Sequence, residues 1–167
     1  MKDDFLERID DYMIYVYNIA LKMLGDEDAK DAAQDAIIKA YQNIDTFRGE
    51  CALSTWLYRI TVNECKDFIR KRRTFIPIDE IIELEGGVLP EVELERVENA
   101  KLLDKALQYI SVENREILIL REMLGYEYKE ISSELGIPEG TVKSRINRAK
   151  KNLKNAILSL TLYGGTK

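Results

Sequence analysis

The stretch EYKEISSELGIPEGTVKSRINRAKKNLKNA, residues 127–156, has the pattern of a helix-turn-helix motif. Ile131 and Leu135 lie four residues apart in the first expected helix, and Gly136 supplies the permissive residue that a tight turn needs. Pro138 suits the first turn of the next helix, because the N–H that it lacks would have no partner there. The pattern therefore predicts two helices joined at a glycine.

The second helix of this motif has one apolar face and one basic face. The apolar residues repeat at i, i+4, i+7 and i+11, and they are Val142, Ile146, Ala149 and Leu153. The opposite face and its margins carry the candidate DNA-contacting residues Thr141, Lys143, Ser144, Asn147, Arg148 and Lys151. A helix that recognises bases in the major groove needs such a surface. The solvated face of a helical hairpin is the alternative, and the coincidence of turn, stripe and basic face favours DNA binding.

Charge is segregated along the chain, although the total is acidic. The 167 residues include 25 Lys and Arg and 30 Asp and Glu, which gives a formal net charge of −5. Residues 66–73 carry a net charge of +4, residues 77–99 carry −7 and residues 129–154 carry +4. Two basic segments separated by an acidic one indicate two DNA-contacting modules and a strand between them that avoids DNA.

The composition argues against an enzyme or a metalloprotein. The chain has no histidine, which removes the usual general base, and it contains neither a P-loop nor a GxGxxG motif. Cys51 and Cys65 form no CxxC pair, so we expect no zinc site, no cofactor and no small-molecule substrate. We find no apolar leader and no run near the ~18 residues of a membrane span, and we expect a cytoplasmic protein.

Helical periodicity dominates the first 75 residues. The spacing of apolar residues predicts one long amphipathic helix over 5–24 and a second over 26–44, which Asp26 is suited to cap. A turn is expected at 47–50, and a third helix follows over 54–73.

The pattern breaks after this helix and then resumes. Prolines and glycines punctuate the acidic stretch, which we interpret as a flexible linker with a short helical turn at 78–84. Helical spacing returns over 97–110, and Ser111 is suited to cap a further helix that ends at Gly125.

The fold class follows from these elements. Helical periodicity occurs throughout, and alternation typical of strands is nearly absent. The sequence predicts an all-α protein with two small helical domains, residues 1–75 and 96–163, joined by a flexible acidic linker at 76–95.

A second basic stripe lies on the helix expected over 54–73. Its residues are Arg59, Asn63, Lys66, Arg70 and Arg73, and the opposite side carries Leu53, Leu57, Ile60 and Phe68. A basic stripe with one Asn suggests phosphate contacts and a single base-recognising side chain. Glu64 falls within the apolar side, where an internal ion pair is the one explanation we can offer.

Aromatic residues precede and begin this helix. Phe47, Trp56 and Tyr58 lie near Arg48 in sequence, and aromatic rings beside basic groups can stack on unpaired bases. Packing in the hydrophobic core is the alternative for each ring, and we favour it for Trp56.

Three stretches of the chain carry a family resemblance. They are DAAQDAIIKAY (31–41), FRGECALSTWLYRITVNECKDFIRKRR (47–73) and IPEGTVKSRINRAKKNL (137–153). In this order they resemble the signature stretches of bacterial extracytoplasmic-function (ECF) RNA polymerase sigma factors, of the sigma-70 family. The resemblance implies a sigma-2 and a sigma-4 helical domain on a flexible connector. It also implies a protein that binds core RNA polymerase and directs initiation at promoters with minus-10 and minus-35 elements.

The resemblance implies roles for individual residues. The segment that docks on the clamp helices of the polymerase β′ subunit is matched by Asp31, Gln34, Asp35 and Ile38. The loop that holds a base flipped from the minus-10 element is matched by residues 47–55, which begin with Phe47 and Arg48. The asparagine that helps to recognise this element is matched by Asn63. From the basic stripe itself, Arg59, Lys66 and Arg70 are expected to contact phosphates. The residues that recognise the minus-35 element are matched by Lys143, Ser144, Asn147 and Arg148.

Two residues depart from the family pattern. Cys51 stands where members often have a small polar residue, and Asn147 stands where some have an aromatic one, so both bear on which promoter sequence is preferred.

The resemblance also implies partners. Besides promoter DNA, the polymerase β subunit is an expected partner. Members are commonly held inactive by a membrane-bound anti-sigma factor, and we expect one here.

Two other functions compete with this interpretation. A stand-alone helix-turn-helix regulator would leave the first basic stripe and the aromatic loop without a role, and it would be expected to dimerise. A protein-interaction scaffold such as an anti-sigma factor would not need two basic stripes.

Overall fold

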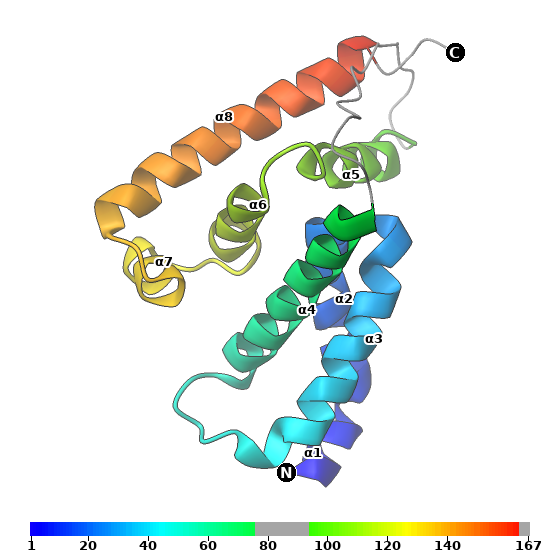
Figure 1. Cartoon of the computed structure of the whole chain (residues 1–167), viewed down its shortest axis with the longest axis vertical. Coiled ribbons are helices and arrows are strands. Elements are labelled where there is room, and N and C mark those ends of the chain that lie inside the picture. Colours follow the sequence, from blue (N-terminus) through cyan, green and yellow to red (C-terminus); the bar gives the residue numbers. More distant parts are fainter. Residues whose placement is uncertain (76–93, 164–167) are drawn as a thin grey trace. The chain divides into compact units, whose positions relative to one another are not determined.

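The computed structural model describes residues 1–75 and 94–163, and every regular element in these two ranges is helical (Figure 1). The prediction of an all-α protein is therefore confirmed. The chain divides into two compact units, Met1–Asp79 and Glu80–Lys167, which we describe one at a time. The helical turn expected at 78–84 lies outside the described residues.

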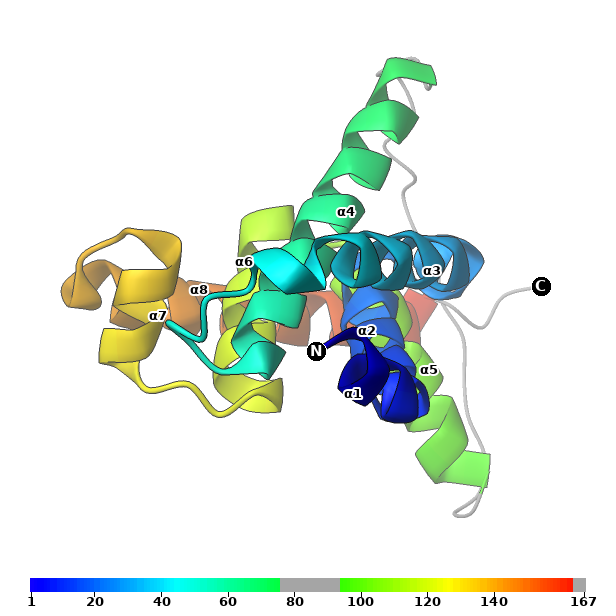
Figure 2. The ribbon, with the colours of Figure 1, turned by 90° about the horizontal axis from the view of Figure 1, so that it is seen from below.

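The first unit is a bundle of three main helices with a short helix at its start. The elements are α1 (Lys2–Glu7), α2 (Ile9–Leu24), α3 (Asp26–Asn43), the 3-10 turn η1 (Ile44–Thr46) and α4 (Leu53–Phe75). Helices α2, α3 and α4 pack against one another, as the two ribbon views show (Figures 1 and 2). The loop between η1 and α4 lies at the end of the bundle near the N-terminus (Figure 1).

The single helix predicted over 5–24 is wrong, because the chain leaves helical geometry at Arg8 (φ −113°, ψ 16°). Phe5 is buried, and its ring centroid lies 4.9 Å from that of Tyr12. Seven residues of straight helix would separate them by about 10 Å along the axis. The break therefore lets Phe5 fold back onto the bundle.

The start of α3 also differs from the prediction. Gly25, at φ 78°, is the N-cap residue, and Asp26 is the first helical residue and makes no capping hydrogen bond. Its carboxylate still favours the helix, because negative charge near an N-terminus interacts well with the helix dipole.

The core of the first unit combines a small-residue face with larger side chains. The small residues all lie on α3, and they are Ala29, Ala32, Ala33, Ala36 and Ala40. Larger buried side chains come from the two neighbouring helices, and include Val16, Ile19 and Met23 of α2 and Leu57, Tyr58 and Val62 of α4. Alanines are small enough for neighbouring helices to approach closely, and α3 packs against both α2 and α4.

The second unit contains the helix-turn-helix. Its elements are α5 (Leu94–Leu107), α6 (Val112–Leu118), the π-helical turn η2 (Ile119–Met123), α7 (Tyr128–Leu135) and α8 (Glu139–Tyr163). The predicted cap at Ser111 is confirmed, since its Oγ accepts a hydrogen bond from the Asn114 N–H at 3.3 Å. The predicted helix from Ser111 to Gly125 is present, but its second half, η2, is π-helical rather than α-helical.

Residues far apart in this unit meet in one core. The buried residues include Ile117, Leu120, Ile131, Val142, Ile146 and Ala149. Arg115 is also buried; its guanidinium donates to the carbonyl oxygens of Ile110 at 3.2 Å and Gln108 at 3.1 Å, which holds the turn between α5 and α6. Across the described ranges, no helix is long and apolar enough to cross a membrane.

Candidate nucleic-acid and protein interfaces

The helix-turn-helix in the second unit is held by local hydrogen bonds. Gly136 ends α7 in the left-handed conformation (φ 64°, ψ 34°), as the sequence predicted. The Ile137 N–H donates to the Ser132 carbonyl at 3.1 Å, and the Ser132 hydroxyl donates to the Ile137 carbonyl at 2.6 Å. At the start of α7, the Glu127 N–H donates to the Glu130 carboxylate at 2.7 Å, which forms a capping box. The relative positions of α7 and α8 are thus fixed by contacts inside the motif.

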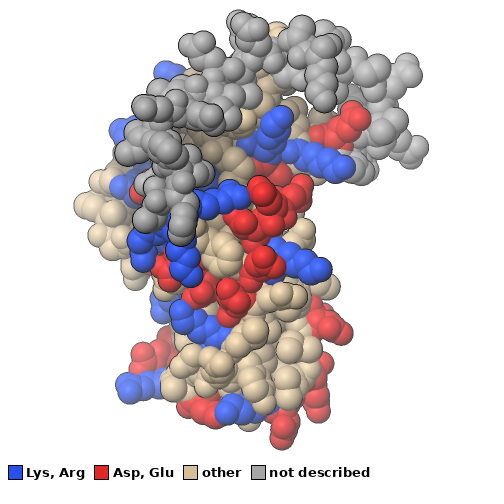
Figure 3. All heavy atoms as spheres, turned by 45° about the vertical axis from the view of Figure 1, so that its right-hand side comes forward, with Lys and Arg blue, Asp and Glu red and all other residues tan. Residues whose placement is uncertain are grey.

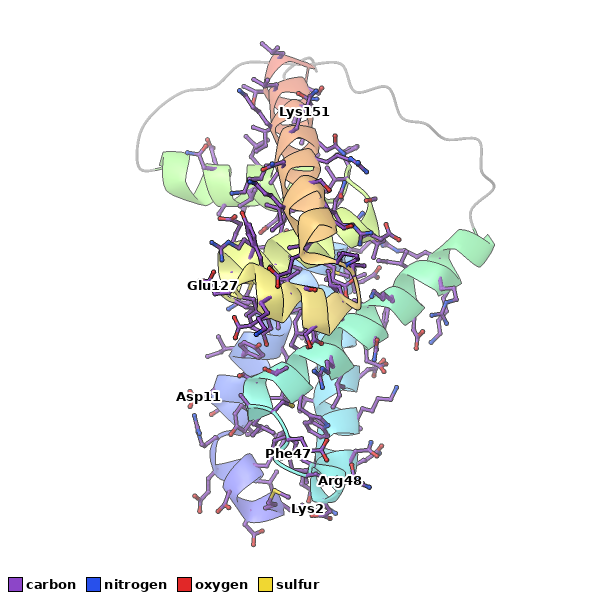
Figure 4. All side chains as sticks on the ribbon, turned by 90° about the vertical axis from the view of Figure 1, so that its left-hand side faces the viewer. Lys2, Asp11, Phe47, Arg48, Glu127 and Lys151 are labelled. Carbon is purple, nitrogen blue, oxygen red and sulfur yellow. The ribbon has the colours of Figure 1, made fainter. Side chains whose placement is uncertain are left out.

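The outer face of α8 presents the side chains that the sequence singled out. Val142, Ile146 and Ala149 are buried, whereas Leu153 is half-buried. Thr141 is half-buried at the margin, and the exposed residues are Lys143, Ser144, Asn147, Arg148 and Lys151. Figure 4 labels Lys151 on α8 and Glu127 at the start of α7. The arrangement gives a polar, basic helix face that a nucleic-acid groove could accept.

Two further contacts define the limits of this face. The Ser144 hydroxyl donates to the Thr141 carbonyl at 3.1 Å, so its oxygen remains as an acceptor for a partner. Lys150 is turned away toward η2, where its Nζ lies 2.8 Å from the Glu122 carboxylate. Lys150 therefore takes part in a surface ion pair with η2 and is not one of the residues of this face.

The basic stripe of the first unit lies along α4. Arg59, Asn63 and Arg70 are exposed, and Lys66 is half-buried; the side chain of Arg73 lies outside the described part of the chain. Arg59 approaches the Cys51 sulfur at 4.0 Å, and Arg70 forms an ion pair of 2.9 Å with Asp67 of the same helix.

The inner face of α4 is more polar than the sequence analysis assumed. Its buried residues are Leu57, Tyr58, Thr61, Val62 and Cys65, whereas Leu53, Ile60 and Phe68 are half-buried. Thr61 is satisfied within its own helix, because its hydroxyl donates to the Leu57 carbonyl at 2.8 Å. Glu64, at the edge of this face, forms an ion pair with Lys39 of α3, which confirms the suggestion of an internal ion pair.

A pocket opens where the loop after η1 meets the start of α4. Its volume is about 490 Å³, and it is lined by Thr46, Phe47, Arg48, Glu50, Cys51, Trp56 and Arg59. The Phe47 and Trp56 rings lie 5.5 Å apart and tilted by 49°, so together they form one aromatic wall. Figure 4 labels Phe47 and Arg48 in this loop. An aromatic wall beside arginines is suited to an unpaired base.

The structure decides between base holding and core packing for two of the aromatic residues. Tyr58 is only 1% exposed and packs in the bundle, which is the core-packing alternative. Trp56, for which core packing was favoured, is half-buried and lines the pocket. Glu50 also lines the pocket and belongs to the loop 47–55 that the resemblance matched to the base-holding loop, whereas Thr46 lines it although the sequence did not single it out. No local pattern marks Thr46, because it reaches the pocket wall only through the fold around η1.

The exposed face of α3 carries the remaining site residues. Asp31, Gln34, Asp35 and Ile38 are all exposed, while the opposite face of the helix is the buried alanine surface. Ile38 stands out because 55% of its surface is open to water beside acidic residues. Acidic and basic side chains lie next to one another on the first unit (Figure 3). An exposed apolar side chain with charged neighbours suits a protein partner.

The two thiols differ in their surroundings, and no metal cluster is found in the described ranges. Cys65 is fully buried, and burial raises the pKa of its thiol to about 12. Cys51 is half-buried in the wall of the pocket.

The chain is similar in sequence to known protein families and to individual proteins. The family described as Sigma-70 region 2 matches residues 9–75, and Sigma-70, region 4 matches residues 100–153. The ECF RNA polymerase sigma factor SigW of Bacillus subtilis is 34% identical, over 95% of this chain and 91% of that protein. The ECF RNA polymerase sigma-E factor of Escherichia coli K12 is 33% identical, over 89% of this chain and 84% of that protein.

Solved structures show the same similarity. One is the sigma factor RpoE in complex with the anti-sigma factor NepR from Bartonella quintana, with 25% identity and a TM-score of 0.68 over 95% of this chain and 98% of that chain. CnrH in complex with the cytosolic domain of CnrY shares the fold, with 23% identity and a TM-score of 0.63 over 95% and 90% of the two chains.

Proposed function

The chain belongs to the ECF family of RNA polymerase sigma factors, and from this membership we propose how its residues divide the recognition of a promoter. As a sigma factor it binds core RNA polymerase and directs transcription initiation at promoters. The observation that carries this conclusion is that both family regions occur in order in one chain, each over a different helical unit. Sigma factors are not themselves enzymes, and we propose no catalytic activity and no cofactor for this chain.

The domain at 96–163 recognises the minus-35 element in this proposal. Its support is the exposed basic face of α8, from Thr141 to Lys151, on a helix whose opposite side is anchored in the core. Arg148 and Asn147 can pair with base edges, and Lys143 and Lys151 can contact phosphates. The Ser144 oxygen can accept a hydrogen bond from a base amino group.

The domain at 1–75 captures the separated strand of the minus-10 element. DNA stacking averages about 1.4 kcal/mol per step, so opening a few base pairs costs several kcal/mol that bound bases must offset. The pocket beside Phe47 and Arg48 would take one flipped base, and Asn63 would recognise the same region. Arg59, Lys66 and Arg70 would hold the backbone.

The exposed side of α3 docks on core polymerase. Asp31, Gln34, Asp35 and Ile38 would contact the clamp helices of the β′ subunit, with further contacts to the β subunit elsewhere on the chain. The support is the exposure of Ile38 among acidic side chains on a helix fixed from behind by its alanine face. The linker at 76–95 would connect the two domains across the polymerase.

Regulation by an anti-sigma factor is also proposed. RpoE is found in complex with the anti-sigma factor NepR, and CnrH is found in complex with the cytosolic domain of CnrY. We propose that this chain acts in the cytoplasm and is held inactive by a membrane-bound anti-sigma factor.

A transcription assay tests the proposed function against the alternative of a stand-alone helix-turn-helix regulator. Core RNA polymerase with this protein should yield transcripts that start at defined promoters of its genome and are absent with core enzyme alone. A stand-alone regulator would bind DNA but would yield no such transcript. Absence of promoter-specific transcripts with active core enzyme would therefore reject the sigma-factor assignment.

A further inference from the structure

Lys39 joins the two helices to which the proposed functions of the first domain are assigned. It lies on α3 one turn after Asp35, and its ammonium group forms an ion pair with the Glu64 carboxylate of α4. The Lys39 side chain is 52% exposed, but that of Glu64 is only 13% exposed. A carboxylate with so little exposure to water needs its counter-ion. This pair therefore constrains the packing of α3 against α4 more than a surface ion pair would.

The surroundings of Lys39 extend this contact to both proposed surfaces. The pKa of Lys39 is raised, first by the hydrogen bond and charge of Glu64 and further by the charges of Asp67 and Asp35. Asp67, one turn beyond Glu64 on α4, is also the partner of Arg70 at 2.9 Å. The charge of Lys39 is thus felt by Asp35 on the proposed polymerase surface and by Asp67, the partner of Arg70 on the proposed DNA surface.

A second ionic contact between the same helices lies near the far end of α4. Arg72 contacts Asp28 at 2.7 Å and Glu27 at 3.0 Å, both at the start of α3. Glu64 immediately follows Asn63, whereas Arg72 is more than two turns further along α4. Lys39 is therefore well placed to set the rotation of α4 where Asn63 projects.

We propose that Lys39 is a positioning residue for promoter opening: by holding Glu64, it fixes Asn63 and the phosphate-contacting side of α4 relative to the polymerase-docking helix. Lys39 itself touches neither DNA nor polymerase in this role. The inference rests on the proposed function of the first domain. It assigns to the Lys39–Glu64 pair the role of fixing α4 relative to α3, which neither residue could do alone.

The test compares four variants in the full chain bound to core polymerase. Lys39→Met removes the charge and keeps the aliphatic stem, and Lys39→Met with Glu64→Gln also removes the lone buried charge. Lys39→Arg keeps the cation. Lys30→Met is the matched control, because Lys30 is an exposed lysine of the same helix. For each variant we would measure affinity for core polymerase, the thermal unfolding midpoint, and the rate of open-complex formation on duplex and premelted promoter DNA.

The proposal makes a distinct prediction for each measurement. Lys39→Met should slow opening of duplex promoter by about fivefold or more, with core affinity within about twofold of wild type. Lys39→Met should also lower the thermal unfolding midpoint, because it leaves the Glu64 carboxylate buried without a counter-ion. The double variant should recover the wild-type midpoint, because no lone carboxylate stays buried, but it should still open duplex promoter slowly. Lys39→Arg and Lys30→Met should behave as wild type, and premelted DNA should reduce the defect.

Three results would overturn the proposal. Opening by Lys39→Met that equals that of Lys30→Met would remove any role for the pair. Recovery of opening together with the unfolding midpoint in the double variant would reduce Lys39 to a stability contact. Loss of core affinity in Lys39→Met would instead place Lys39 in the docking surface. The proposed function fails separately, namely if the wild-type chain with core enzyme opens no promoter at all.

Discussion

Replacement of Arg148 by alanine tests the minus-35 face most directly. Arg148 is exposed on α8, between Ile146 and Ala149, whose side chains anchor the opposite face in the core. Because the guanidinium is exposed, its loss should change the free energy of unfolding by no more than about 0.5 kcal/mol. A bidentate contact with a guanine contributes about 1–3 kcal/mol of discrimination, so affinity for the promoter should fall by roughly 5- to 150-fold.

The assay should separate a base contact from a phosphate contact. Binding of the reconstituted holoenzyme to fluorescent promoter duplex would be measured for wild type, Arg148→Ala and Arg148→Lys over a range of salt concentrations. A phosphate contact needs only charge, so Arg148→Lys would retain affinity, and Arg148→Ala would lower the salt slope by about 1. A base contact needs the planar guanidinium, so both variants would lose affinity and sequence preference.

A control variant guards against a general charge effect. Lys101→Ala makes the same change of charge at an exposed position on α5 and should bind promoter as wild type does. Wild-type affinity of Arg148→Ala, alone and combined with Ser144→Ala, would refute the assignment of this face to the minus-35 element.

Further predictions concern the other surfaces. Asn63→Ala should keep core binding and minus-35 recognition but impair opening, seen as weaker permanganate reactivity of minus-10 thymines; full reactivity would rule out a role for this side chain. Asp35→Arg should reduce capture of core polymerase in a pull-down without loss of helicity by circular dichroism, and undiminished capture would move the docking surface elsewhere. A thiol reagent at pH 8 should label Cys51 but not Cys65 in the folded chain, because burial keeps the pKa of Cys65 near 12 and its thiol protonated. Labelling of both at equal rates would show that the core around Cys65 opens readily.

Local signals in the sequence predicted much of this structure. Gly136 marked the end of α7 because a left-handed residue there favours glycine, and Ser111 marked a helix start through its capping hydroxyl. The apolar stripe of α8 predicted which face is buried, since a helical period fixes the face once the helix is known. These features depend on residues close together in the chain.

Features that depend on tertiary contacts could not be predicted in this way. The break at Arg8 accompanies the packing of Phe5 on Tyr12, and helical spacing alone does not reveal such a return. Tyr58 resembled a pocket residue by its neighbours in sequence, yet its rotation on α4 places it in the core. Thr46 joins the pocket wall only through the path of the chain around η1. The roles of the site residues in DNA and polymerase binding stay predictions.

The π-helical turn η2 gives its segment room for one residue more than a regular helix would hold. The Leu124 N–H donates to the Ile119 carbonyl at 2.9 Å, five residues back rather than four, so the turn holds one residue more than an α-helix would. Because the bulge absorbs this extra residue, deletion of one residue within Ile119–Met123 would close the turn into regular helix and leave the following residues at nearly the same rotation. Arg121 of this turn contacts the Tyr126 carbonyl and the Glu127 carboxylate at 2.8 and 3.3 Å. A one-residue gap here, in a gene or in an alignment, therefore compares a π-helical turn with an α-helical one and not two loop lengths.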